Sequence, residues 1–150
     1  MALEGEYVPT PVQWVREQVE AYESSAGSRA NTLRDTGRPV VIVTTRGNRT
    51  GKLRKTPLMR VEHGGEYALV GSMGGAPRHP VWVHNLRADP GAVTVQDGPD
   101  PFAAVVREVS GEERATWWER AVAAYPPYAD YQQRTERTIP VFVATARDRA

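Results

Sequence analysis

Short β-branched runs bounded by proline and glycine constrain the fold of this chain more than any other feature. The clearest run, PVVIVTT at residues 39–45, has the composition of a buried strand. Two hairpins and a last strand follow the same pattern, at residues 55–63 with 66–72, at 92–97 with 102–109, and from Ile139 onward. No strand–helix rhythm repeats between them. The pattern therefore predicts a mainly β fold with peripheral helices, an antiparallel barrel of about six strands, rather than a doubly wound sheet.

The N-terminal segment carries a helical pattern instead. Thr10 and Pro11 have the form of a capping box with proline at the first helical position. One apolar face then follows at helical spacing, formed by Val12, Val15, Val19 and Tyr22. The polar stretch from Ser24 to Gly37 is expected to be a surface linker.

Helical patterns return only later in the chain. A short helix is expected between Pro80 and Pro90, and Ser110 begins another that ends near Ala124. A further helical segment follows from Tyr125. The length of 150 residues fits one domain, with the N-terminal helix and linker at 1–37 and the barrel core at 38–146.

The absence of cysteine excludes whole classes of chemistry. Without thiols the chain has no disulfide, no thiolate nucleophile, no iron–sulfur cluster and none of the common zinc sites. The histidines, His63, His79 and His84, lack the spacing of a ligand set, so we expect no metal site. A redox function would therefore depend on an organic cofactor. No apolar run approaches the roughly 18 residues of a membrane span, and the N-terminus lacks a signal-peptide pattern, which favours a cytosolic protein.

A cluster of positive charge stands out against a formal net charge of only +1. The segment 46–60 contains no acid, and its cations are Arg46, Arg49, Lys52, Arg54, Lys55 and Arg60. Its GNRTGKL sequence is one residue short of a phosphate-binding P-loop, with Leu53 where serine or threonine would bind magnesium. Pro57 also prevents a helix from following. Nucleotide hydrolysis is therefore not expected.

Three interpretations of this basic turn remain. It could be a solvated loop between two strands, a nucleic-acid contact, or a site for the anionic tail of a small cofactor. The nearly neutral net charge is weak support for a nucleic-acid partner, and we expect none.

Two further clusters carry residues suited to chemistry. GSMGGAPRHPVW, residues 71–82, places two glycines, an arginine and a histidine between an expected strand and a helix, where backbone amides attract anions. YPPYADY places Tyr125, Tyr128 and Tyr131 on one helical stripe. Such a stripe is usually core, although its hydroxyl groups can also donate protons or orient a carbonyl.

Together, VTTRGNRTGKLRKTPL, GSMGGAPRHPVWVHNLRADP and YPPYADYQQRTERTIPV resemble the deazaflavin (coenzyme F420)-dependent nitroreductase and quinone reductase family. The resemblance covers about Val40 to Val143. It implies a split β-barrel of the flavin-reductase type and an oxidoreductase that uses coenzyme F420, an 8-hydroxy-5-deazaflavin with a phosphodiester and an oligoglutamate tail.

The resemblance also implies the roles of individual residues. The tail would be bound by Asn48, Arg49, Thr50, Arg54 and Lys55. The ring would lie over Thr56, Pro57, Leu58 and Met59, beside Val70, Gly71, Ser72 and Met73, and beside Val81, Trp82, Val83, His84, Asn85 and Tyr128. Some relatives have lysine at the position of Met73, so one tail contact would be either lost or moved to Arg78. The substrate would contact Ser72, Trp82, Tyr125 and Tyr131.

The expected reaction is transfer of a hydride from the reduced coenzyme to a quinone, an activated enone or a nitroaromatic. Tyr125, Ser72 and Tyr128 are the expected catalytic residues, since their hydroxyl groups can hydrogen-bond the accepting oxygen. Two alternatives stay open: an FMN-binding split-barrel oxidoreductase, and a non-catalytic deazaflavin carrier.

The role of the N-terminal helix is also open at this stage. Its apolar face could cover the barrel, pair with a second copy in a homodimer, or make weak peripheral contact with the inner face of the membrane. The membrane contact has the least support, because Arg16, Glu17, Glu20 and Glu23 do not form a basic polar face. Both a monomer and a homodimer agree with the sequence.

Overall fold

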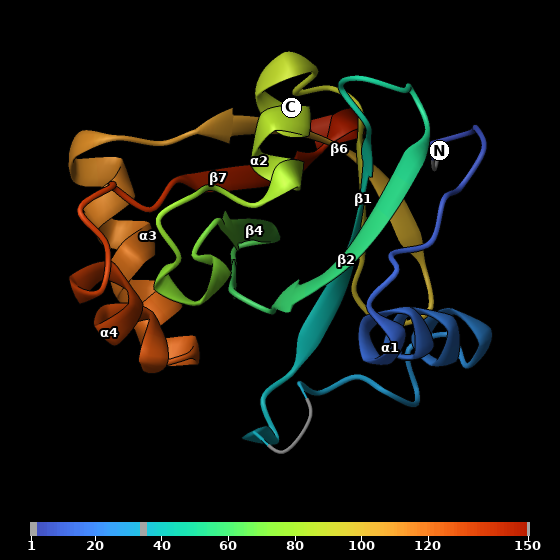
Figure 1. Ribbon diagram of the computed structural model, residues 1–150, viewed down its shortest axis with the longest axis horizontal. Helices are drawn as coiled ribbons and strands as arrows, with labels where there is room; N and C mark the ends of the chain where they lie inside the picture. The colour runs from blue at the N-terminus through green and yellow to red at the C-terminus, as the bar shows by residue number, and fades with distance from the viewer. Residues whose placement is uncertain (1–2, 34–35, 150) are drawn as a thin grey trace.

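One antiparallel sheet curls into an open barrel in the computed structural model, which describes residues 3–33 and 36–149 (Figure 1). The sheet order is β2-β1-β5-β6-β7-β4-β3, and each neighbouring pair is antiparallel. The strands are β1 (Val40–Arg46), β2 (Leu53–Met59), β3 (Glu62–His63), β4 (Glu66–Val70), β5 (Val93–Gln96), β6 (Pro101–Glu108) and β7 (Val141–Ala146). The predicted mainly β fold is therefore confirmed.

The sheet has seven strands rather than six, because the expected strand at 55–63 is two strands. Its first part, β2, pairs with β1, and its second part, β3, pairs with β4 at the other end of the sheet order. Between them, the Arg60 amide donates to the Pro39 carbonyl and the Val61 carbonyl accepts from the Ala68 amide. These two residues thus connect the two edges of the sheet, and the connection draws the edges together.

The long apolar run of β1 is explained by burial on both faces. Val40 and Ile42 belong to one hydrophobic cluster and Val41 and Val43 to a second, each residue being at most 2% exposed. The first cluster lies toward the helices α1 (Gln13–Ser24), α3 (Gly111–Ala124) and α4 (Pro127–Gln133), and the second toward α2 (Val81–Ala88). A strand with two buried faces shows no polar alternation, which is why the run is continuous in the sequence.

The N-terminal helix α1 (Gln13–Ser24) lies beside β2 (Figure 1). It begins two residues later than expected, with Val12 rather than Thr10 as its N-cap, and no side chain caps it. It also continues through Ser24, the residue at which the linker was expected to start. The cap prediction was wrong because the Thr10 hydroxyl instead accepts from the Val12 amide, 3.3 Å away, before the helix begins.

The later helices agree more closely with expectation. The helix α2 (Val81–Ala88) lies between Pro80 and Pro90, and α3 (Gly111–Ala124) follows Ser110, which is the N-cap but makes no side-chain capping bond. The segment from Tyr125 contains a separate helix, α4 (Pro127–Gln133), and short 3₁₀ turns occur at Met73–Gly75 (η2) and Arg147–Arg149 (η3). The last strand begins at Val141 rather than Ile139, although Ile139 is fully buried in the core. Figure 1 shows α3 and α4 at the opposite side of the barrel from α1.

Tyr22 ties α1 to the barrel. Its hydroxyl accepts from the Gly98 amide at 2.7 Å and donates to the Gln96 carbonyl at 3.2 Å, in the turn between β5 and β6. The side chain is only 1% exposed. Removing the hydroxyl would take this partner from the buried Gln96 carbonyl and from the partly buried Gly98 amide.

We expect Tyr22→Phe to lower the free energy of unfolding by about 1–3 kcal/mol, because unsatisfied buried polar groups carry a cost of that order. Tyr7→Phe is the matched control. The buried Tyr7 hydroxyl has no hydrogen-bond partner among the described residues, so its removal should be neutral or stabilising. Urea unfolding of both variants measures the difference, and equal effects would contradict the role given to Tyr22.

Candidate functional site

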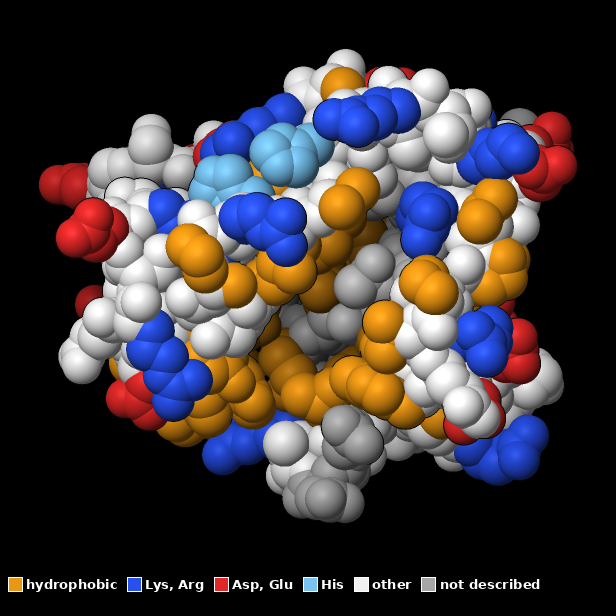
Figure 2. Space-filling view, in the orientation of Figure 1, with side chains coloured by type: hydrophobic (Ala, Val, Ile, Leu, Met, Phe, Trp, Pro, Cys, Tyr) orange, Lys and Arg blue, Asp and Glu red, His pale blue; other side chains and the backbone are white. Residues whose placement is uncertain are grey.

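A pocket of about 750 Å³ opens between β2, the segment from β4 to α2, and α4. In Figure 2 it is a hollow with largely hydrophobic walls and Lys and Arg side chains around its rim. A volume of this size is typical of a cofactor or ligand site. Most of the residues named from the resemblance line it: Arg54, Lys55, Thr56, Pro57, Leu58, Met59, Val70, Ser72, Met73, Val81, Trp82, Asn85, Tyr125, Tyr128 and Tyr131.

The remaining named residues lie outside the lining. Asn48, Arg49 and Thr50 are exposed in the turn between β1 and β2, and Gly71 and Val83 are buried beside the pocket. An added Cβ at Gly71 would lie 2.7 Å from Val83 Cγ2 and 2.9 Å from Pro140 Cγ, so glycine is needed there for packing. Arg78 and His84 line a separate, adjoining pocket.

The strand β2 contributes one wall because it is an edge strand. It pairs with β1 on one side, and its other side faces the pocket from Arg54 to Met59. Pro57 has no amide to donate, which an edge strand tolerates. Asn85 of α2 fastens the neighbouring turn, since its side chain donates to Thr45 Oγ1 and accepts from the Asn48 amide. Asn48 therefore acts in the structure through its backbone.

The N-terminal segment forms a part of the wall that the sequence did not predict in detail. Thr10, Val12, Trp14 and Val15 line the pocket, with Leu33 from the following linker. Val12 and Trp14 are 46% and 38% exposed, which is unusual for large apolar residues. Of the roles considered for α1, covering the barrel is the one seen in the structure.

Several cations of the basic turn form ion pairs or hydrogen bonds with other parts of the protein. Lys52 pairs with Glu6 at 2.7 Å, and Arg46 donates to the backbone carbonyls of Gly51 and Glu4. Arg60 pairs with Asp97 at 2.9 Å. Burial lowers the pKa of Arg60, but the hydrogen bond to Asp97 and the Asp97 charge outweigh burial and leave this pKa raised.

Lys55 and Arg54 differ in what they offer to a ligand. Lys55 pairs with Glu23 of α1 and lies over the Tyr7 ring, with its ammonium 4.8 Å from the ring centre. Arg54 lines the pocket and forms no ion pair with any described residue. Its guanidinium is thus the cation of this wall that has no protein counter-ion.

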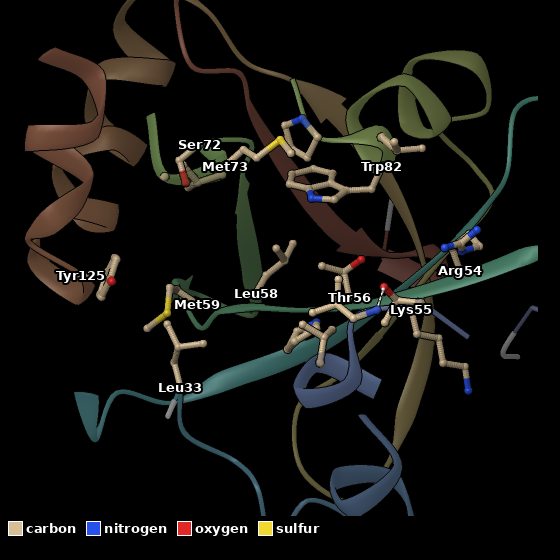
Figure 3. A pocket seen from close by; sticks show the side chains of 18 of the residues that line it. Leu33, Arg54, Lys55, Thr56, Leu58, Met59, Ser72, Met73, Trp82 and Tyr125 are labelled. Atoms are coloured by element: carbon tan, nitrogen blue, oxygen red, sulfur yellow. Dashed lines mark hydrogen bonds between the residues drawn. The ribbon is translucent and has the colours of Figure 1, made fainter. Parts of the chain in front are cut away.

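The three tyrosines of the YPPYADY stretch meet at the opposite end of the pocket (Figure 3 labels Tyr125). The Tyr125 and Tyr131 hydroxyls lie 3.2 Å apart, and the Tyr125 and Tyr128 rings meet edge to face with centroids 5.1 Å apart. The hydrogen bond to Tyr131, and then burial, raise the pKa of Tyr125 to about 12. Burial raises the pKa of Tyr128, which is 4% exposed. Tyr125 and Tyr128 therefore stay protonated near neutral pH, so each hydroxyl keeps a proton that it can donate.

Ser72 is held in place by a loop whose anchor the sequence did not reveal. The Arg137 guanidinium donates to the carbonyls of Gly71, Ser72 and Ala76 at 2.7–3.1 Å. This loop contains the left-handed residue Met73, with φ of 46°, and Gly75, where a Cβ would lie 2.7 Å from the Tyr131 carbonyl. A single arginine in a polar stretch carries no local signal of such a role, because its partners are some 60 residues away in the chain.

Within the described ranges 3–33 and 36–149, no group of three or more His, Asp or Glu side chains could hold a metal ion. In the same ranges, no helix is long and apolar enough to cross a membrane.

The fold is thus a curled antiparallel split barrel. Its edge pocket has apolar walls, with Arg54 at one end and three phenols at the other. The comparisons with known proteins agree. The family model for F420H(2)-dependent quinone reductases matches residues 14–146, and the chain belongs to this family. Coenzyme F420 is therefore its cofactor, and the expected oxidoreductase class is confirmed.

Individual relatives support the same assignment. An F420H(2)-dependent quinone reductase of Mycobacterium tuberculosis is 37% identical over 112 residues, which are 73% of this chain and 74% of the relative. A solved F420-H2 dependent reductase is 54% identical, with a TM-score of 0.67 over 71% of this chain and 94% of its own. A second solved structure, described as a domain-swapped dimer, is 47% identical, with a TM-score of 0.70 over 90% of this chain and 99% of its own.

The tyrosine cluster gives a prediction for alkaline pH. The ordinary pKa of tyrosine is about 10, and that of Tyr125 is raised to about 12. As the pH rises above roughly 10, the unfolded chain releases this proton first, so folding stability should fall between about pH 10 and pH 12. Tyr131→Phe removes the main cause of the shift and should lower the pKa of Tyr125. Titration of the tyrosine Cζ signals by NMR measures this, and an unchanged Tyr125 pKa would contradict the assigned hydrogen bond.

Proposed function

We propose that the pocket binds reduced coenzyme F420 lengthwise, with the deazaflavin ring over β2, the anionic tail toward Arg54, and the quinone at the tyrosine end. The observation that carries this proposal is the polarity of the pocket. Figure 3 shows Arg54 and Lys55 at one end and Tyr125 at the other, with Leu58 and Met59 between them.

The residues present fit such a cofactor. The middle of the pocket offers a predominantly apolar floor and roof to a planar ring, from Leu58 and Met59 on one side and Trp82 and Met73 on the other (Figure 3). The guanidinium of Arg54 can bind phosphate or carboxylate oxygens with two parallel hydrogen bonds. We propose that Asn48, Arg49 and Thr50 extend this contact along the exposed turn, where a long flexible tail would lie.

The reduced deazaflavin supplies a hydride when it is bound. The chain's own residues orient the acceptor and stabilise the charge that develops on its oxygen. The Ser72 and Tyr125 hydroxyls would hydrogen-bond that oxygen, and the raised pKa of Tyr125 keeps its proton available as a donor. Tyr128 is buried behind Tyr125 and would hold its ring in place. Trp82 and Tyr131 would close the site against water.

A quinone is the acceptor that the family indicates, and activated enones and nitroaromatics share its electron-poor character. Anaerobic mixing of the protein with reduced coenzyme and each acceptor tests the proposal, through the return of the absorbance of the oxidised coenzyme. Tight coenzyme binding without turnover on any acceptor would favour the carrier alternative. A purified protein that contains bound flavin would favour the FMN alternative.

We expect Ser72→Ala and Tyr125→Phe each to lower kcat by about 10- to 100-fold, since each removes a donor to the developing oxyanion. The Kd of the coenzyme should change little, because neither residue is assigned to the tail. Tyr7→Phe serves as the control and should leave kcat unchanged. Equal losses in kcat and in coenzyme affinity would refute this division of roles.

We expect Arg54→Gln to weaken coenzyme binding by about tenfold and to flatten its dependence on salt, because a screened charge-assisted bond is lost. Lys52→Gln is the control from the same segment. Lys52 already pairs with Glu6 and does not line the pocket, so its substitution should have a much smaller effect. Fluorescence titration at two salt concentrations measures the Kd of both variants. Equal effects would favour the interpretation of the basic turn as a solvated loop.

We propose a cytosolic protein that forms a homodimer or remains a monomer. The relative described as a domain-swapped dimer supports the dimer, and sedimentation velocity distinguishes the two states. Weak contact with the inner face of the membrane would rest on the exposed Val12 and Trp14. Co-sedimentation with anionic vesicles tests that contact, which the acidic residues of α1 oppose.

A further inference from the structure

A second pocket, of about 500 Å³, adjoins the first one, which is called the main pocket below. Its lining combines arginine and histidine side chains with proline and apolar side chains. It is called here the cationic pocket, and its polar residues are Arg78, His79, His84 and Arg137. Met73 and Val81 line both pockets, so a single molecule can extend from one to the other. None of the described residues that line the cationic pocket has a carboxylate.

Arg137 is fixed at the base of the cationic pocket. Besides its bonds to the three loop carbonyls, its Nη1 group lies 2.8 Å from His79 Nδ1. These four contacts use four of the five N–H donors of a guanidinium. The fifth, on Nη2, remains for a ligand, and the charge is pre-positioned because the side chain cannot move without breaking the loop's anchor.

The contact with Arg137 also fixes the state of His79. A guanidinium can only donate, so His79 Nδ1 must accept, and the imidazole is neutral with its proton on Nε2. Burial, and then the charge of Arg137, lower the pKa of His79, which agrees with this tautomer. His79 therefore has an Nε2–H donor, with the His84 ring centroid 6.0 Å from its own.

The charge of the cationic pocket is not balanced by the protein. Arg78 and Arg137 form no ion pair with any residue in the described ranges. The acid that influences His79 is Glu108, and both of its oxygens accept from Arg87 at 2.8 Å. Two guanidinium groups therefore line one concave site, and neither has a carboxylate partner among the described residues. This arrangement favours a bound anion.

We propose that the cationic pocket binds an oxyanion group, a phosphate or carboxylate, that belongs to a molecule extending from the main pocket across Met73 and Val81. A volume of about 500 Å³ leaves room for more than one such group, and Met73 and Val81 connect this pocket to the main one. Two sources share this chemistry: the outer carboxylates of the coenzyme tail, and an acidic substituent on the hydride acceptor. The choice between these sources rests on the proposed function, whereas the anion site itself does not.

The three histidines provide a direct test, because His79 and His84 lie in the cationic pocket and His63 lies on β3, against Trp117. Inorganic phosphate and glutarate are titrated separately into the full-length protein at constant pH and ionic strength, and the histidine ring signals are followed by NMR. We expect saturable shifts of the His79 and His84 signals, with the His63 signal unchanged. Equal shifts of all three, or none, would overturn the proposal.

Arg78→Gln should weaken binding of these anions by about tenfold, through loss of a charge-assisted contact. Arg78 is exposed, so the variant should fold normally. The matched control is Arg29→Gln, on the exposed linker after α1, and it should leave the Kd unchanged. Equal affinities in both variants would also overturn the proposal, whatever the activity of the protein.

Coenzyme with a long glutamate tail then distinguishes the sources. If the tail occupies the cationic pocket, the bound coenzyme should shift the His79 and His84 signals and prevent further shifts by phosphate. If an acidic acceptor occupies it, phosphate should still bind in the coenzyme complex, and Arg78→Gln should raise the KM of a sulfonated quinone but not that of its neutral parent. If neither result is obtained with the coenzyme complex, the proposal that one ligand extends between the two pockets across Met73 and Val81 is refuted. Failure of turnover alone would count against the proposed function and not against the anion site.

Discussion

The connection between β2 and β3 is the constraint on which the rest of the structure depends. These strands are consecutive in the chain but occupy the two ends of the sheet order, with only Arg60 and Val61 between them. So short a connection requires the two edges of the sheet to lie next to each other, and the sheet must curl. The curl buries β1 on both faces and brings the end of β2 close to β4. The main pocket opens where these elements meet α4.

The charges of the basic turn are divided between folding and binding. Lys52, Lys55 and Arg60 have acidic partners from other segments, and Arg46 is bound to backbone carbonyls. Acids from other segments therefore neutralise three of the six cations of this segment, whereas Arg49 and Arg54 form no ion pair with any described residue. Arg54 is the unpaired cation of this segment that lines the main pocket, and Arg49 is exposed in the turn outside it. The contribution of a charged segment to binding depends on which of its charges remain unpaired, more than on their number.

Most of the fold could be predicted from local patterns, and the failures have identifiable causes. The continuous β-branched run at 39–45 and the proline-bounded segment at 80–90 specify their elements through composition alone. The break at Arg60 could not be predicted, because the residues on both sides of it have strand character and only the pairing partners differ. The predicted N-cap of α1 was wrong because a threonine hydroxyl has several backbone amides within reach.

The candidate site was predictable to the extent that its residues form contiguous motifs. The Arg54–Met59 strand and the tyrosine stripe were found because each is a local pattern that also resembles a known family. Arg137 was missed because its partners lie in another segment, and so was the contribution of Thr10 and Leu33 to the pocket wall. A single sequence does not reveal the long-range contacts of individual polar residues, because the same residue types also occur on solvent-exposed surfaces.

Because α1 forms one wall of the pocket, docking of this helix onto the barrel and binding of a ligand are coupled equilibria. The helix is not part of the sheet, and it is held to the barrel by Tyr22, by the Lys55–Glu23 pair and by its apolar face. A ligand that touches both β2 and the Val12–Val15 segment stabilises the docked helix by the same free energy with which the docked helix strengthens ligand binding. Occupancy of the pocket and protection of the N-terminal segment from proteases therefore both depend on the same coupling free energy. Protease resistance of the segment that contains α1 would thus report ligand binding in the candidate site.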